Sequence, residues 1–225
     1  MTDPSPAVSG PGLVSPGENG LFVSFEGGDG AGKSTQLGLL ATWLEGAGHE
    51  VVRTREPGGT DLGRQLRAAV LHGEDVGPRT EALLYATDRA HHVDTVVRPA
   101  LARGAVVLTD RYLDSSVAYQ GDGRDLGAEE VERLSAWATQ GLLPRLTVLL
   151  DLDPQVGLGR LTGAPDRLER AGLEFHARTR RAFLERARTG GDRWLVLDAT
   201  RPTGELHEAV RARVAGLLGR VGVTR

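Results

Sequence analysis

An eight-residue run near the start of the chain has the composition and spacing of a phosphate-binding loop. Residues 27–34 read Gly-Gly-Asp-Gly-Ala-Gly-Lys-Ser, which is the pattern G-x-x-x-x-G-K-S. Glycines let a backbone turn closely round phosphates with its N–H groups inward, the lysine can reach the terminal phosphates, and the serine hydroxyl can ligate Mg²⁺. The residues that we expect to bind a nucleotide are Gly27, Gly28, Asp29, Gly30, Ala31, Gly32, Lys33, Ser34 and Thr35.

The flanks of this loop and its lysine support that interpretation. The apolar run at residues 21–25 reads as a strand before the loop, and residues 35–40 have helical spacing after it, which is the context that the motif requires. Lys33 is the only lysine among the 27 Lys and Arg residues of the chain. This arginine-rich sequence thus has its single lysine at the position where a compact point charge would bind phosphate. A glycine-rich turn that binds no ligand would not explain this choice of residue.

Two further patterns indicate recognition of a base and of a metal ion. Tyr85 and Arg89 are four residues apart and would share one helix face. An aromatic ring there can stack on a base while the guanidinium donates to the base edge, although alone the pair could be a core tyrosine and a surface arginine. Asp110 ends the apolar run 105–110, and a carboxylate that closes a buried strand beside a phosphate-binding loop is a natural partner for Mg²⁺.

Three other stretches place arginines where they could come near this loop. They lie in residues 55–60 (Arg-Glu-Pro-Gly-Gly-Thr), at Arg67, and at Arg160 with residues 166–169 (Asp-Arg-Leu-Glu). Taken by itself, the segment at residues 55–60 could be an exposed turn, and Arg67 could lie on a solvated helix face. The third segment is interrupted at residues 162–165 and is expected to be a mobile lid, whose arginines would neutralise charge during phosphoryl transfer.

Strands and helices must alternate to bring these residues together. Strands are predicted at residues 21–25, 50–54, 105–110, 146–151 and 194–198. Helices are predicted from the loop to about residue 45, along a stripe of Leu62, Leu66, Ala69 and Val70, from Pro78 to beyond residue 96, at 128–140 with Val131, Leu134 and Trp137 on one face, after Pro154, at 175–188 and at 205–218. This alternation predicts an α/β fold whose parallel sheet is covered on both faces and binds ligands at the carboxyl ends of its strands.

The order of these motifs resembles that of thymidylate kinases. The match runs from about Leu21 to about Leu218, and its most specific part is residues 110–121, Asp-Arg-Tyr-Leu-Asp-Ser-Ser-Val-Ala-Tyr-Gln-Gly. The resemblance implies a P-loop NTPase fold with a central five-stranded parallel sheet, and a homodimeric nucleoside-monophosphate kinase. Such an enzyme transfers the γ-phosphoryl group of ATP, with Mg²⁺, to dTMP and yields dTDP.

The resemblance also implies which residues meet the phosphates and the metal. Asp29 would help to position the acceptor phosphate and the metal ion, with Ser34 and Asp110 as the other metal partners. The dTMP phosphate would be held by Arg55, Arg67 and Arg111.

Recognition of the nucleoside is implied for a second set. Tyr85 stands where the family usually has phenylalanine stacked on thymine, and Arg89 would donate to thymine O4. Ser116 and Gln120 would meet the base, and Tyr119 would lie under the deoxyribose, where a 2′-hydroxyl would clash.

The residue at position 30 indicates the subfamily. Some thymidylate kinases carry an arginine inside the loop where this chain has Gly30, so the resemblance implies a catalytic arginine from the lid, as in the bacterial type. Thr162 stands where some relatives have another basic residue. Arg160 or Arg167 is left for the role, and we prefer Arg167. The predicted catalytic set is then Lys33, Asp29, Arg111, Arg167 and Arg160.

Composition limits the other possibilities. The 225 residues suffice for one sizeable core, and the net charge of -3 gives no overall basic character for nucleic-acid binding. The chain has no cysteine, its six histidines form no metal-like spacing, and it has no apolar run long enough to span a membrane. Residues 1–19 are rich in Pro, Gly and Ser and read as a disordered extension rather than a signal peptide, which leaves residues 20–225 as one kinase domain and a cytoplasmic location by default.

Three alternatives share the phosphate-binding loop. A GTPase would normally carry Asn-Lys-x-Asp, which a chain with a single lysine in its loop cannot supply. A motor or assembly ATPase would leave residues 110–121 unexplained. A kinase for another monophosphate or for a deoxynucleoside is nearer, but three arginines on the acceptor side favour a monophosphate.

Overall fold

The computed structural model of the chain describes residues 20–162 and 164–221. The expected disordered extension at residues 1–19 lies outside the described residues, as does Gly163 in the segment predicted to be a lid. None of the helices among the described residues combines the length and the apolar character needed to cross a membrane.

Five parallel strands form one sheet in the order β2-β3-β1-β4-β5. Their bounds are β1 Leu21–Glu26, β2 Val51–Arg55, β3 Val106–Asp110, β4 Leu146–Asp151 and β5 Trp194–Asp198. The predicted five-stranded parallel sheet is therefore confirmed. Three strands differ from their predicted bounds by one residue: β1 extends to Glu26, β2 begins and ends one residue later than predicted, and β3 begins at Val106. Arg55 therefore ends β2 instead of opening the next loop, and it is in register with Asp110 of β3.

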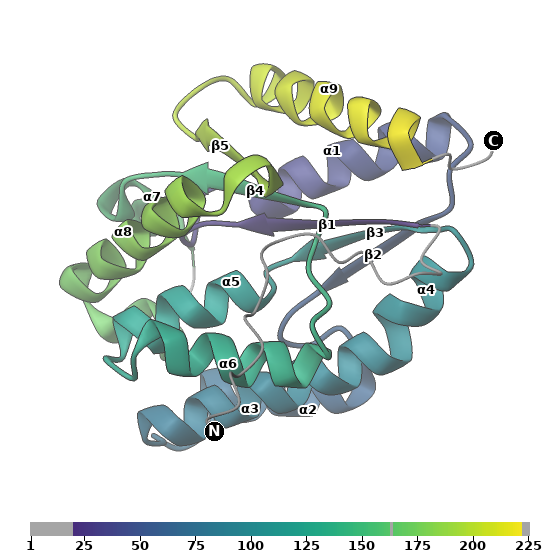
Figure 1. Cartoon of the computed structure of the whole chain (residues 1–225). Coiled ribbons are helices and arrows are strands. Elements are labelled where there is room, and N and C mark those ends of the chain that lie inside the picture. The colour runs from purple at the N-terminus through teal and green to yellow at the C-terminus, as the bar shows by residue number, and fades with distance from the viewer. Residues whose placement is uncertain (1–19, 163, 222–225) are drawn as a thin grey trace, which may run out of the picture.

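Helices cover both faces of the sheet, as predicted. They are α1 Lys33–Gly46, α2 Asp61–His72, α3 Pro78–His92, α4 Arg98–Ala102, α5 Leu113–Ser116, α6 Ala128–Thr139, α7 Pro154–Gly159, α8 Leu173–Thr189 and α9 Thr203–Val221. Figure 1 shows α1 and α9 on one side of the sheet and α2 to α6 on the other. Two π-helical segments, Val93–Val97 and Val117–Gly123, continue α3 and α5.

Alternation along β1 divides the core between the two faces. Leu21, Val23 and Phe25 belong to the cluster beneath α1 and α9, whereas Phe22 belongs to the opposite cluster with residues of α4 and β3. The opposite face also buries two polar side chains of β1, Ser24 and Glu26, of which Ser24 donates to Thr147 Oγ1 of β4 at 3.0 Å. A strand buried on both faces in this way rigidly holds the loop that follows it.

Two predicted apolar faces are wrong in detail. In α6, Val131 is buried but Trp137 has 81% of its surface exposed, and the buried side is completed by Ser135, Ala138 and Thr139. In α2, Leu62 is exposed, and the helix packs through Gly63, Val70 and Leu71. Both helices lie against other helices rather than against the sheet, so small residues at the contact replace large apolar ones.

Candidate active site

The carboxyl edge of the sheet brings the predicted segments together. The loop of residues 27–32 follows β1, residues 56–60 follow β2, and Arg111 follows β3. Backbone hydrogen bonds join neighbouring segments, from Glu56 N to Asp110 O at 3.0 Å and from Arg111 N to Phe25 O at 2.9 Å. This is the edge at which parallel α/β sheets bind ligands.

At two positions the phosphate-binding loop has a backbone that strongly favours glycine. Gly27 and Gly30 have φ angles of 130° and 73°. A Cβ atom would lie 2.4 Å from Leu150 O at Gly27 and 2.2 Å from Gly157 O at Gly30. Helix α1 starts directly after the loop and no side chain caps it, so its first N–H groups and its dipole remain available to an anion.

Lys33 lies folded inside this loop. Its Nζ donates to Gly28 O at 2.7 Å and to Gly27 O at 3.1 Å, and the side chain is buried. Burial, together with the charge of Arg111, lowers the pKa of the Lys33 ammonium group to about 8. A bound phosphate would favour the charged form again, because an opposite charge stabilises it.

The two residues expected to share a metal ion are also brought together. Ser34 Oγ donates to Asp110 Oδ2 at 2.8 Å, on the exposed side of the loop. A hydroxyl and a carboxylate oxygen fit Mg²⁺, which prefers oxygen ligands and usually binds through one or two protein groups with phosphates and water. Among the described residues, no group of three or more His, Cys, Asp or Glu side chains is arranged to hold a metal ion alone.

Arg111 ties the loop to the acceptor side. It has a left-handed backbone with φ of 71°, and its guanidinium donates to Gly27 O at 3.0 Å and to Asp29 Oδ1 at 2.5 Å. Burial alone would raise the pKa of Asp29, but the charges of Arg111 and Lys33 outweigh burial and lower it. Arg111 also donates to Tyr119 Oη at 3.3 Å and lies 5.0 Å from the centre of its ring.

A cleft lies beside Asp29 and Arg111, and its volume, including the part open to solvent, is about 500 Å³. The predicted residues that line it are Asp29, Arg67, Tyr85, Arg89, Arg111, Ser116, Tyr119 and Gln120. Burial raises the pKa of the Tyr85 and Tyr119 hydroxyls, so both rings are uncharged at neutral pH. Arg55 is exposed at the end of β2 and is absent from the described lining of the cleft.

Known proteins match this chain over most of their length. The family profile described as Thymidylate kinase matches residues 25–210. A thymidylate kinase of Clavibacter michiganensis subsp. michiganensis is 60% identical over 203 residues, which cover 88% of this chain and 96% of the relative. The thymidylate kinase of Leifsonia xyli subsp. xyli is 61% identical over 201 residues, which cover 88% of this chain and 95% of the relative. The thymidylate kinase of Deinococcus radiodurans is 53% identical over 199 residues, which cover 87% of this chain and 97% of the relative. The chain belongs to the thymidylate kinase family.

The two candidate arginines of the predicted lid lie in different places in this thymidylate kinase. Arg160, just after α7, donates from Nη1 to Gly30 O of the phosphate-binding loop at 3.1 Å. Arg167 is buried and donates to Glu81 Oε2 at 3.2 Å, beside the cleft. Glu81 also accepts from Gln120 Nε2 at 2.9 Å. In this conformation Arg160 touches the loop, whereas Arg167 supports the cleft wall.

Arg89 is held by contacts that the sequence did not reveal. The residue is only 1% exposed. Its side chain donates from Nε to Glu56 Oε2 at 2.7 Å and from Nη2 to Ser116 Oγ at 3.1 Å. Further bonds run to Tyr112 O at 3.2 Å and Ser135 Oγ at 3.3 Å. Four of the five guanidinium N–H groups thus have partners among the described residues, which leaves one on Nη1 for a ligand in the cleft.

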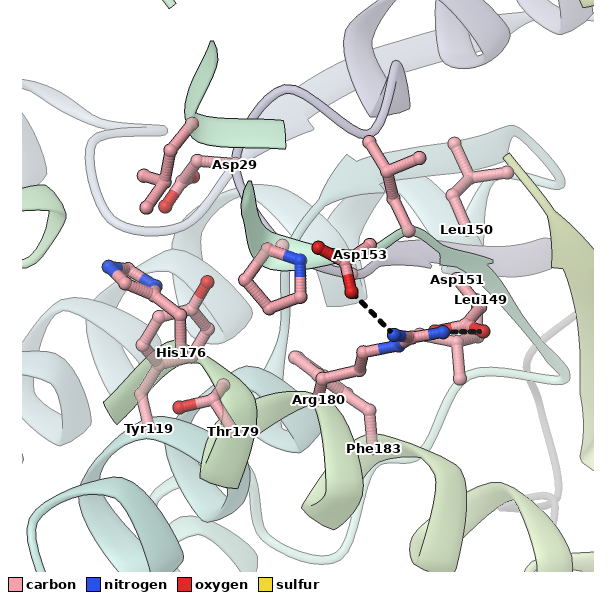
Figure 2. A pocket seen from close by; sticks show the side chains of 15 residues that line it. Asp29, Tyr119, Leu149, Leu150, Asp151, Asp153, His176, Thr179, Arg180 and Phe183 are labelled. Atoms are coloured by element: carbon pink, nitrogen blue, oxygen red, sulfur yellow. Dashed lines mark hydrogen bonds and ion pairs between the residues drawn. The ribbon is translucent and has the colours of Figure 1, made fainter. Parts of the chain in front are cut away.

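A second cavity lies on the other side of the loop, between β4, α7 and α8, and measures about 430 Å³ with its opening. Figure 2 shows Arg180 of α8 reaching towards Asp151 and Asp153 in this cavity, with Asp29 and His176 at its other end. Arg180 binds both oxygens of Asp151, at 2.7 and 2.9 Å. This charge pairing engages the carboxylate that ends β4.

Glu26 is another residue of the site that sequence reasoning missed. It ends β1, is fully buried, and accepts from Tyr112 N at 2.8 Å and Ser115 Oγ at 2.6 Å. Burial, with the nearby charge of Asp114, raises the pKa of Glu26 to about 8. Its position at the end of an apolar run, immediately before the loop, is the only signal that the sequence offered.

Proposed function

We propose that this chain transfers the γ-phosphoryl group of ATP to dTMP and produces ADP and dTDP. The observation that carries the proposal is a wall shared by the phosphate-binding loop and the cleft. Asp29 belongs to the loop and lines the cleft, and Arg111 donates to both Asp29 and Gly27 O. A donor phosphate on the loop and an acceptor phosphate in the cleft would meet there, and such proximity is what direct transfer requires. Membership of the thymidylate kinase family supports the choice of the two nucleotides.

On the donor side, the backbone N–H groups of the loop and of the first turn of α1 would bind the ATP phosphates. Ser34 and Asp110 would hold Mg²⁺, with Asp29 close to both reacting phosphates. The metal ion supplies charge neutralisation on the phosphate oxygens when it is bound. Lys33 would leave its two carbonyl partners and turn to the terminal phosphates.

On the acceptor side, arginines would hold the dTMP phosphate. Arg111 lies at the shared wall, and Arg67 is held at the cleft by a bond from Nη1 to Pro57 O at 3.1 Å. Arg55 would join them from the end of β2. Three cations beside the loop would neutralise the acceptor phosphate, which would otherwise repel the incoming donor.

The inner part of the cleft would take the nucleoside. Tyr85 offers a neutral ring for stacking on the base, and Tyr119 lies where the deoxyribose would rest. Arg89 has one N–H left to donate to the carbonyl O4 of thymine. Ser116 accepts from Arg89, so its own hydroxyl proton is available to the base. Gln120, held by Glu81, completes this wall.

The transfer itself needs no nucleophilic side chain from the protein, because phosphoryl transfer depends mainly on positioning and electrostatic stabilisation. Lys33, Arg111 and an arginine of the segment after α7 would supply the positive charge. For that last role we propose Arg160, supported by its contact with Gly30 O, over Arg167, which is engaged by Glu81.

A panel of acceptors tests the proposal. With ATP and Mg²⁺, we expect dTMP to be converted and thymidine to be inert, because the cleft is built for a phosphate. We expect dCMP to be strongly disfavoured, since its 4-amino group would face the N–H groups of Arg89 and leave a buried charged group unpaired. The methyl group missing from dUMP is worth only about 1–3 kcal/mol, so dUMP should be a weak substrate.

The measurement is ADP release in a coupled assay over this panel. Rapid turnover of thymidine without turnover of dTMP would point to a nucleoside kinase. A preference for a purine monophosphate would show that the cleft reads a different base. ATP hydrolysis that does not depend on any acceptor would favour the ATPase class.

We further propose that two copies of the chain form a homodimer through the helices on the α3 and α6 side. Trp137 of α6 is 81% exposed and Leu83 of α3 is 56% exposed, and these two helices pack against each other. Large apolar side chains left exposed on neighbouring helices are typical of a surface that a partner covers. A second copy is the partner that the family resemblance implies.

Replacing Trp137 tests this interface. We expect Trp137→Glu to weaken self-association by about thirtyfold or more, because truncating an aromatic residue that is a hot spot of an interface costs about 2 kcal/mol or more. The measurement is the sedimentation coefficient over a range of concentrations. Leu173→Glu, which alters an exposed leucine of α8, is the matched control. A wild-type chain that remains monomeric at all concentrations would contradict the proposal.

A further inference from the structure

Glu56 links the base-facing arginine to two residues that do not touch the cleft. Its Oε2 accepts from Arg89 Nε at 2.7 Å, and its Oε1 lies 2.8 Å from His92 Nδ1. His92 Nε2 lies 2.6 Å from Thr54 Oγ1. Glu56 is 3% exposed and His92 is fully buried, so the contact between these two residues is shielded from water, whereas Thr54 is half-buried.

With a neutral His92 ring, the donors and acceptors in this chain of contacts have one consistent arrangement. A carboxylate can only accept, so Nδ1 of His92 must carry a hydrogen and donate it to Glu56. In a neutral ring Nε2 then accepts the proton of the Thr54 hydroxyl. The bonds therefore run from Thr54 to His92 to Glu56, and Glu56 receives Arg89 on its other oxygen. Thr54 and Glu56 belong to β2 and its following loop, whereas His92 and Arg89 belong to α3.

This arrangement does two things for Arg89. It compensates a buried guanidinium charge, which would be costly without a partner. It also fixes the rotation of the planar fork, because Nε is bonded on one side and Nη2 on the other. The direction of the remaining Nη1 hydrogen then follows from these bonds.

We propose that Glu56, oriented by His92 and Thr54, is a positioning residue that sets the base specificity of the cleft. By fixing Arg89, it selects pyrimidine monophosphates with a carbonyl acceptor at position 4 over those with an amino group. This inference rests on the proposed function, since it requires that Arg89 meets the base.

The first test is Glu56→Gln, with Glu50→Gln as a matched control. Glutamine is neutral and offers one acceptor oxygen in place of two, so the Arg89 guanidinium loses the negative charge that pairs with it. We expect the ratio of kcat/KM for dTMP to that for dCMP to fall by on the order of tenfold, the range in which contacting residues couple. Glu50 pairs with Arg103 at the surface at 2.7 Å, and its replacement should leave the ratio unchanged.

The second test uses two replacements of His92, and it stands even where Glu56→Gln does not fold. The amide nitrogen of asparagine can take the place of Nδ1 and donate to Glu56, whereas leucine cannot. We expect His92→Leu to lower the dTMP/dCMP ratio and His92→Asn to restore most of it. Equal ratios in the two variants, both matching wild type, would overturn the inference.

A double-mutant cycle separates positioning from a general loss of stability. If Glu56 acts through Arg89, adding Glu56→Gln to Arg89→Gln should not change the dTMP/dCMP ratio further, whatever the melting temperatures. Independent, additive effects on the ratio would refute the proposal. Wild-type protein that does not phosphorylate dTMP at all would instead refute the proposed function.

Discussion

The variant Lys33→Met is expected to lose kcat by about a hundredfold or more, the usual cost of removing a preorganised charge that stabilises a transition state. Lys33 is buried in the phosphate-binding loop, with Nζ bonded to Gly27 O and Gly28 O. From these carbonyls the ammonium group would turn to the terminal phosphates when ATP binds to the loop. Because the charge acts most strongly on the transferring group, kcat should fall more than the KM for ATP rises.

Two other variants show whether position as well as charge matters at Lys33. Lys33→Arg keeps a positive charge but presents a larger, planar group to a tightly wound loop, and we expect it to recover little activity. Arg53→Met removes a cation that pairs with Glu45 at the surface, and it should leave kcat near the wild-type value. Single-turnover kinetics with ATP and dTMP provide the measurement, and a near-normal kcat for Lys33→Met would exclude the loop from catalysis.

The second large effect is expected for Arg160→Ala, which should lower kcat by on the order of a hundredfold and change the KM for dTMP little. Arg160 approaches the loop at Gly30 O, next to the phosphates that would be transferred. Arg167→Ala should behave differently. Its side chain pairs with Glu81, which also holds Gln120 in the cleft wall, so we expect a rise of a few-fold in the KM for dTMP.

Steady-state kinetics on the two variants decide between these arginines. The sequence favoured Arg167, and a larger fall of kcat in Arg167→Ala would support that preference over the one drawn from the structure. Arg170→Ala is a suitable control, because Arg170 is exposed and its Nη1 binds Pro165 O within the same segment. Normal kcat in both Arg160→Ala and Arg167→Ala would mean that this segment supplies no catalytic charge.

Much of the fold could be predicted from local patterns. The order of the strands along the chain, the loop after β1 and the carboxylate at the end of β3 all follow from short runs of residues. Errors arose where helices pack on helices. Trp137 was expected to be buried by its spacing, yet small residues make that contact and the tryptophan faces outward. Periodicity identifies a helix, but it does not by itself tell which face meets which neighbour.

The candidate site likewise contains residues that could be identified from the sequence and contacts that could not. Lys33, Ser34 and Asp29 could be identified because the loop is continuous in sequence and its backbone chemistry is local. The partners of Arg89 could not, since Glu56 lies 33 residues away and Ser135 lies 46 residues away. Nothing in the spacing of these residues marks them as a group. The pairing of Arg167 with Glu81, at a separation of 86 residues, is equally invisible.

The sequence by itself therefore determined the class of fold, the phosphate-binding loop and the family. Those features depend on hydrophobic periodicity and on turns that particular residues impose within a few positions. Tertiary structure alone decided how Arg89 is oriented, which arginine touches the loop, and that Trp137 is exposed. Buried charges must find partners wherever the packing places them, and that choice depends on the juxtaposition of distant elements rather than on the neighbours of each residue in the chain.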